Sequence, residues 1–162
     1  MPFFDNERTA WRVFHPPLVH LPIGAIVIAT ILDTISVVIG DRQSLAGEMF
    51  RAATFTLAVG TGGLPFAVVS GLLDRARLTT LGALQSRAVN AHAVVVVAMV
   101  PVSIAATVLR FARYHNATHT PAAAFVLTLA ILTIALAGGR LGGRIRHGRQ
   151  EYSAMPVVAG RE

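Results

Sequence analysis

Hydrophobic and polar positions follow one another along this chain in long blocks. Four apolar runs, at residues 18–39, 52–73, 88–109 and 122–139, are separated by short segments that carry nearly all of the charged residues. Each run is close to the ~20 residues that an α-helix needs to cross ~30 Å of hydrocarbon. The pattern predicts an all-α protein built as a four-helix transmembrane bundle.

The connections between the runs are short and predict how the helices are arranged. They comprise residues 40–51, 74–87 and 110–121. Short connections place consecutive helices side by side and antiparallel, which gives an up-down-up-down bundle. The expected organisation is an interfacial segment (1–17), a transmembrane domain (18–139) and a polar tail (140–162).

Composition narrows the class of protein further. The chain is 54% hydrophobic and 14% charged, which leaves too little polar surface for a soluble domain of 162 residues. It has no cysteine, which excludes disulfides, all-thiolate iron–sulfur clusters and cysteine-ligated zinc. Phosphate-binding loops, zinc-protease helices and nucleophile elbows are also absent from the sequence. We therefore expect no independent catalytic activity.

The basic residues are all arginine and number 14, for a net charge of +6. On a soluble protein this charge would suggest nucleic acid, but here the arginines lie between apolar runs and indicate orientation in the bilayer. One face of the membrane would hold Arg8, Arg12, Arg75, Arg77, Arg87, Arg140, Arg144, Arg146, Arg149 and Arg161, and the other only Arg42, Arg51, Arg110 and Arg113. Both termini are therefore predicted to lie on the cytoplasmic side, with the helices in the inner membrane of a bacterium.

Two histidines lie within apolar runs and are the main candidates for chemistry. His20 in the first run and His92 in the third are expected at a similar depth near the cytoplasmic face. Ionisable groups inside a membrane are rare and are candidate functional residues, so this pair could bind a metal or a cofactor. A hydrogen-bonding or interface-anchoring role is the alternative. Additional ligands could come from His15, His147 and Asp74, although His15 could cap a helix and His147 could be solvated.

Asp33 is the one acidic residue inside an apolar run. Burying an aspartate at the centre of a membrane helix costs about 2.5–3.5 kcal/mol, so a partner is expected. Arg51 and Arg110 lie at the same level and could pair with it, and Thr30 and Thr34 could donate hydrogen bonds. A structural ion pair is favoured over a proton relay, because no second carboxylate accompanies it.

Glycines near the end of the fourth run form two overlapping GxxxG pairs, Gly138 with Gly142 and Gly139 with Gly143. Such pairs allow membrane helices to approach closely. They could serve the packing of the bundle itself or the contact with another subunit, and the former is favoured.

Four motifs resemble a bacterial family of predicted four-helix membrane proteins of unknown function. They are HPPLVHLPIG (15–24), SGLLD (70–74), the spacing of Arg87 and His92, and GGRLGGRIRHG (138–148). Some members of that family look fused to Rieske-type domains, and the family is distantly similar to membrane cytochromes b. The resemblance implies a redox setting, with His20 and His92 as axial ligands of haem.

Two hypotheses of function follow. The first is a b-type haem electron-transfer subunit that exchanges electrons with a quinone or a redox partner in a respiratory complex. The second is a cofactor-free accessory subunit that contacts other membrane subunits or a second copy of itself. A small transporter is disfavoured, because neither a ring of charges nor an inverted repeat is evident.

Overall fold

The computed structural model describes the backbone of residues 15–40, 44–76 and 83–154, and the side chains of residues 18–40, 44–76 and 86–143. Four helices make up this part of the chain. They are α2 (His15–Ile39), α3 (Ser44–Ala76), α4 (Ala83–Arg113) and α5 (Ala122–Ala154). The described residues contain no strand, so the predicted all-α class is confirmed.

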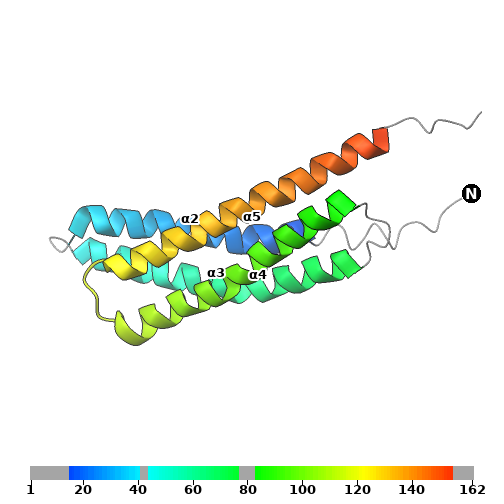
Figure 1. The fold of residues 1–162 in the computed structure, drawn as a ribbon. Coiled ribbons are helices and arrows are strands. Elements are labelled where there is room, and N and C mark those ends of the chain that lie inside the picture. Colours follow the sequence, from blue (N-terminus) through cyan, green and yellow to red (C-terminus); the bar gives the residue numbers. More distant parts are fainter. Residues whose placement is uncertain (1–14, 41–43, 77–82, 155–162) are drawn as a thin grey trace, which may run out of the picture.

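The helices run alternately up and down, as Figure 1 shows. We call the end of the bundle where α2 begins the terminal end, and the end where α2 joins α3 and α4 joins α5 the loop end. All four helices are long and apolar enough to span a membrane. The predicted transmembrane bundle is therefore confirmed.

All four helices are longer than the apolar runs that predicted them, and α3 and α5 differ most. The second span was expected to begin at residue 52, but α3 begins at Ser44. The fourth span was expected to end at Gly139, but α5 continues to Ala154, and its backbone forms most of the predicted tail. Hydropathy marks the segment that matches the hydrocarbon, whereas a helix continues into polar surroundings until its backbone is interrupted. The first helix, α2, ends at Ile39 and is followed by Gly40, whose φ of +64° suits the residue that terminates a helix.

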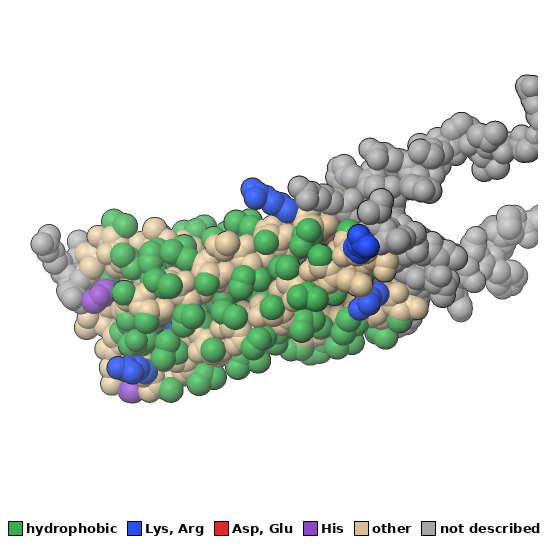
Figure 2. Space-filling view, viewed as in Figure 1, with side chains coloured by type: hydrophobic (Ala, Val, Ile, Leu, Met, Phe, Trp, Pro, Cys, Tyr) green, Lys and Arg blue, Asp and Glu red, His purple; other side chains and the backbone are tan. Residues whose placement is uncertain are grey.

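The outer surface of the bundle is apolar along its length. One large side chain from each helix illustrates this, because Val38, Phe66, Val94 and Val126 are between 62% and 80% exposed. Figure 2 shows apolar side chains over the visible face and arginines towards its ends. This distribution is that of a surface in contact with lipid, with charge left for the interfaces.

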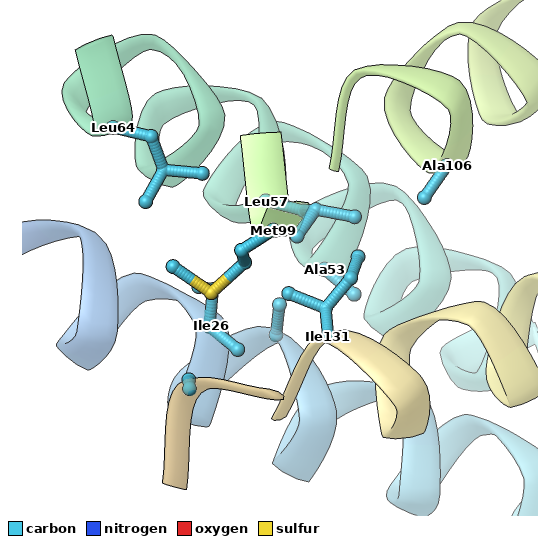
Figure 3. Packing of buried hydrophobic residues seen from close by; sticks show 9 residues of the cluster. Ile26, Ala53, Leu57, Leu64, Met99, Ala106 and Ile131 are labelled. Carbon is cyan, nitrogen blue, oxygen red and sulfur yellow. The ribbon is translucent and has the colours of Figure 1, made fainter. Parts of the chain in front are cut away.

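The core is a narrow cluster along the bundle axis. Ile26, Leu57, Met99 and Ile131, one from each helix, are at most 3% exposed and belong to a single cluster. Figure 3 shows these side chains pointing towards one another from the four helices. The cluster separates a cavity at the terminal end from a polar network at the loop end.

The bundle is built from two closely packed pairs, α2 with α3 and α4 with α5. Gly60 illustrates the α2–α3 contact, because a Cβ added there would lie 2.9 Å from Cβ of Ala25 and 3.3 Å from the carbonyl oxygen of Pro22. Between membrane helices, where lipid is as apolar as the protein, such close backbone approach is a main source of association.

Candidate functional site

A cavity of about 550 Å³ lies in the terminal half of the bundle and is lined by all four helices. Its wall is mostly apolar. The side chains that bring nitrogen or charge into the lining are His20 on α2, Asp74 and Arg75 on α3, and His92 on α4. The structure therefore brings His20 and His92, which lie 72 positions apart, to one cavity.

His92 is half-buried, and its ring is held by the neighbouring helix. Its Nδ1 lies 2.9 Å from the carbonyl oxygen of Gly138 on α5. A carbonyl oxygen only accepts hydrogen bonds, so Nδ1 must carry the proton. In a neutral imidazole the lone pair is then on Nε2, which is the arrangement of histidines that bind metals.

The first GxxxG pair makes this contact possible. A Cβ added at Gly142 would lie 3.3 Å from Cε1 of His92, and one at Gly138 would lie 3.4 Å from Cγ2 of Val96. These two glycines thus serve the packing of α4 against α5. Gly139 and Gly143, the second pair, also line the cavity, but a Cβ added at either would meet no atom within 4 Å.

His20 is more exposed than His92. It lies near the start of α2, beside Pro22, and both residues line the cavity. Its helix is diagonal to α4, since α2 packs against α3 and α5. The two histidines thus approach the cavity from helices that are not packed against each other.

The other proposed ligands divide into two groups. Asp74, in the last turn of α3, lines the cavity and is half-buried. His15 begins α2 and His147 falls within α5, but the side chains of both lie outside the described residues. In the part of the chain whose side chains are described, no three His, Asp or Glu residues form a group that could hold a metal ion.

The loop end contains a buried ion pair between Asp33 and Arg110. The guanidinium contacts both carboxylate oxygens, with Nη1 3.2 Å from Oδ1 and Nη2 bonded to Oδ2. It also donates to Thr54 on α3 at 3.3 Å and to Thr128 on α5 at 2.6 Å. The ring of Phe50 lies 5.1 Å from the guanidinium carbon, in cation–π contact. One arginine therefore joins side chains from all four helices.

Arg51, the other predicted partner of Asp33, is placed differently. It is exposed and donates to Glu48 one turn earlier on α3, at 2.5 Å. The two threonines expected beside Asp33 bond to their own helix instead, Thr30 to the carbonyl of Ile26 and Thr34 to that of Thr30. By depth in the membrane alone, Arg51 and Arg110 were equally good partners for Asp33. The rotation of the helices turns Arg110 towards Asp33 and leaves Arg51 on the surface.

Sequence reasoning missed several members of this polar network. Thr120, just before α5, donates from Oγ1 to Oδ1 of Asp33 at 3.0 Å, and its backbone N–H donates to Oγ of Ser36 at 2.8 Å. Ser36 in turn donates to the carbonyl oxygen of Ala46 at 2.8 Å. For Ser36 the signal was a hydroxyl residue inside an apolar run, but such residues usually bond to their own helix. Thr120 lies in the connection before α5, outside the apolar runs.

The fold and the cavity define a multi-pass α-helical membrane protein. A model of the family described as predicted membrane protein (DUF2231) matches residues 12–150 of the chain. The chain belongs to this family. No curated protein and no solved structure matches it.

Proposed function

We propose that this protein is a membrane subunit that binds a b-type haem between His20 and His92 and takes part in electron transfer. The observation that carries the proposal is that both histidines line one cavity, reached from the diagonal helices α2 and α4. Two ligands on separate helices suit a haem, whose porphyrin supplies the other four bonds to iron.

The chemistry of the donor groups fits a haem. In its neutral form His92 has the lone pair on Nε2, because Nδ1 donates its proton to the carbonyl oxygen of Gly138. A neutral imidazole is the usual axial ligand of haem iron, and hydrogen bonding to its second nitrogen tunes the iron.

The shape of the cavity also supports the proposal. Its volume of about 550 Å³ lies within the roughly 300–1,000 Å³ of ordinary ligand and cofactor sites. Four glycines of α5 contribute wall without side chains, which suits a flat, rigid ligand (Gly138, Gly139, Gly142 and Gly143). The rest of the lining is mainly Val, Ile, Leu and Ala, which would keep water from the macrocycle.

When bound, haem iron would supply a reversible one-electron redox couple. The protein's own residues would hold the iron through His20 and His92, exclude water and set its potential through these imidazoles and the low polarity of the wall. The electron partner we propose is a quinone or another subunit of a respiratory complex. We propose no independent catalytic reaction for this chain.

We propose that the terminal end faces the cytoplasm of a bacterial cell. Arg75, Arg87 and Arg140 are exposed near this end, whereas the exposed arginines described near the loop end are Arg51 and Arg113. Arg110 is 1% exposed and neutralised by Asp33, so it does not count as a loop charge. Because Arg110 is not counted, the difference in the number of exposed arginines between the two ends is larger, and this difference is what the positive-inside rule uses.

The proposal is tested with histidine variants of the detergent-purified protein, expressed with haem supplied. His20→Ala and His92→Ala should each lose most of the bound haem while still inserting into the membrane. His115→Ala is the matched control, because His115 is exposed in the connection at the loop end and should retain wild-type haem. Equal haem content in all four proteins would overturn the assignment of the ligands.

The alternative function predicts a different outcome of the same preparation. A cofactor-free accessory subunit would be colourless at every stage and would co-purify with other membrane proteins in mild detergent. Its lipid-facing apolar surface and the open sites at Gly24 and Gly62, where an added Cβ would meet no atom within 4 Å, would then be the first places to look for a partner.

A further inference from the structure

The charged part of the cavity wall lies at its edge. Asp74 and Arg75 both belong to the last turn of α3, which ends at Ala76, and both line the cavity. Arg75 is exposed and Asp74 is half-buried. The cavity is therefore apolar in its depth and charged where it approaches the terminal end of the bundle.

Arg75 forms no ion pair with another described residue. The ion pairs within the described part of the chain are Arg51 with Glu48 and Arg110 with Asp33. An arginine at the edge of an apolar cavity, without an anionic partner in the described structure, can bind an anionic group of the ligand. The planar guanidinium matches a carboxylate particularly well, because two parallel N–H groups meet two oxygens.

We propose that Arg75 binds the propionate carboxylates of the haem and so selects for a ligand that carries acids on one edge. This inference rests on the proposed function. The carboxylates would lie at the charged edge of the cavity and the apolar edge of the porphyrin in its depth. That division matches the wall, whose charged residues are confined to the last turn of α3.

Asp74 acts in the opposite direction. Its carboxylate would repel an anionic ligand. Consecutive residues of a helix point about 100° apart, so Asp74 and Arg75 reach different parts of the cavity edge. Asp74→Asn should therefore strengthen the binding of an acidic ligand, whereas Arg75→Gln should weaken it. Opposite effects from adjacent residues would not arise from general damage to the end of α3.

The experiment compares haemin with haemin dimethyl ester, in which both carboxylates are neutral. Each is titrated into haem-free protein in detergent, and the ratio of the two affinities is measured for each variant. The ratio cancels differences in folding and in general porphyrin binding. For Arg75→Gln the preference for the free acid should fall about three- to tenfold, a range set by the exposure of Arg75. For Asp74→Asn it should rise.

Two further variants make the test specific. Arg87→Gln removes an exposed arginine near the same end that does not line the cavity, and it should leave the ratio unchanged. Arg75→Lys keeps the charge but loses the planar guanidinium, so it should keep only part of the preference for the free acid. If Arg75→Gln does not fold, this partial fall is the result that tests the role of Arg75.

The outcomes separate this inference from the proposed function. Wild-type protein that binds neither porphyrin overturns both. Protein that binds the acid and the ester equally well, or an Arg75→Gln ratio equal to that of the wild type, overturns the role of Arg75 and leaves the histidine ligands standing. An equal fall in Arg87→Gln would mean that general surface charge, rather than a carboxylate site at Arg75, sets the preference.

Discussion

Arg110 on α4 and Asp33 on α2 form an ion pair in which neither side chain is exposed, joining two helices that lie diagonally across the bundle. The pair also reaches α3 and α5 through Thr54 and Thr128. A charge at this depth is costly alone, and the several hydrogen bonds of the pair offset much of that cost. Nε of Arg110 is buried without a hydrogen-bond partner among the described residues. The loop end is thus held by polar contacts and the terminal end surrounds the cavity.

Removing one partner of this pair should destabilise the bundle more than removing both. Arg110→Met or Asp33→Leu leaves a buried charge alone and should cost about 3–5 kcal/mol of unfolding free energy. The double variant should lose less than either single variant. Unfolding in mixed detergent measures this, with exposed Arg113→Met expected within about 0.5 kcal/mol of wild type. Additive losses in the double variant would contradict the pairing.

Two buried serines give a matched comparison of satisfied and unsatisfied hydroxyl groups. Ser36 and Ser103 are both 0% exposed, but Ser36 links Thr120 to Ala46, whereas Oγ of Ser103 has no hydrogen-bond partner among the described residues. Ser36→Ala should cost about 1–3 kcal/mol, because it leaves the buried N–H of Thr120 without its acceptor. Ser103→Ala should cost nothing or stabilise. Equal effects in thermal unfolding would argue against the linkage at Ser36.

Gly60 and Gly62 test the close packing of α2 on α3. Gly60→Ala places a methyl group 2.9 Å from Cβ of Ala25, and forcing the helices apart should cost about 1–3 kcal/mol. Gly62→Ala meets no atom within 4 Å and should be neutral or gain up to roughly 1 kcal/mol from helix propensity. Unfolding curves of the two variants that coincide would show that this interface is looser than described.

The protonation of His92 can be measured without any cofactor. Nitrogen-15 NMR of histidine-labelled protein should show that the neutral ring of His92 carries its proton on Nδ1 rather than Nε2, because Nδ1 donates to the carbonyl oxygen of Gly138. Gly142→Ala, whose Cβ would lie 3.3 Å from Cε1 of the ring, should shift these signals. Gly139→Ala should not, because its Cβ meets no atom within 4 Å. A protonated Nε2 in the wild type would remove the lone pair proposed for the metal.

Orientation can be tested with reporter fusions. Alkaline phosphatase, which is active only after export, should be active when fused after Gly40 at the loop end and inactive when fused after Ala76 at the terminal end. The reason is the arginine asymmetry described above, with Arg110 buried and neutralised. The reverse pattern of activity would place the histidine cavity near the outer face of the membrane.

The helices, their order and the depth of the polar residues could be predicted from sequence, because each depends on the local pattern of hydropathy. The partner of Asp33 could not be predicted in this way. Arg51 and Arg110 lie at the same depth, and only the rotation of their helices decides which of them faces Asp33. The same holds for His20 and His92. Their similar depth is visible in the sequence, but whether they share a cavity depends on how four helices pack. Thr54 and Thr128 escaped notice because threonine also bonds readily to its own helix, as Thr34 does. Thr120 escaped notice because it lies in the connection before α5, outside the apolar runs.

The most direct test of the proposed function is a reduced-minus-oxidised visible spectrum of the wild-type protein, purified in detergent from cells supplied with haem. The shared cavity of His20 and His92 predicts the sharp bands of a b-type haem, with about one haem per chain by pyridine haemochrome assay. A flat spectrum would contradict the proposal, and the cofactor-free accessory subunit would then become the leading account of this protein.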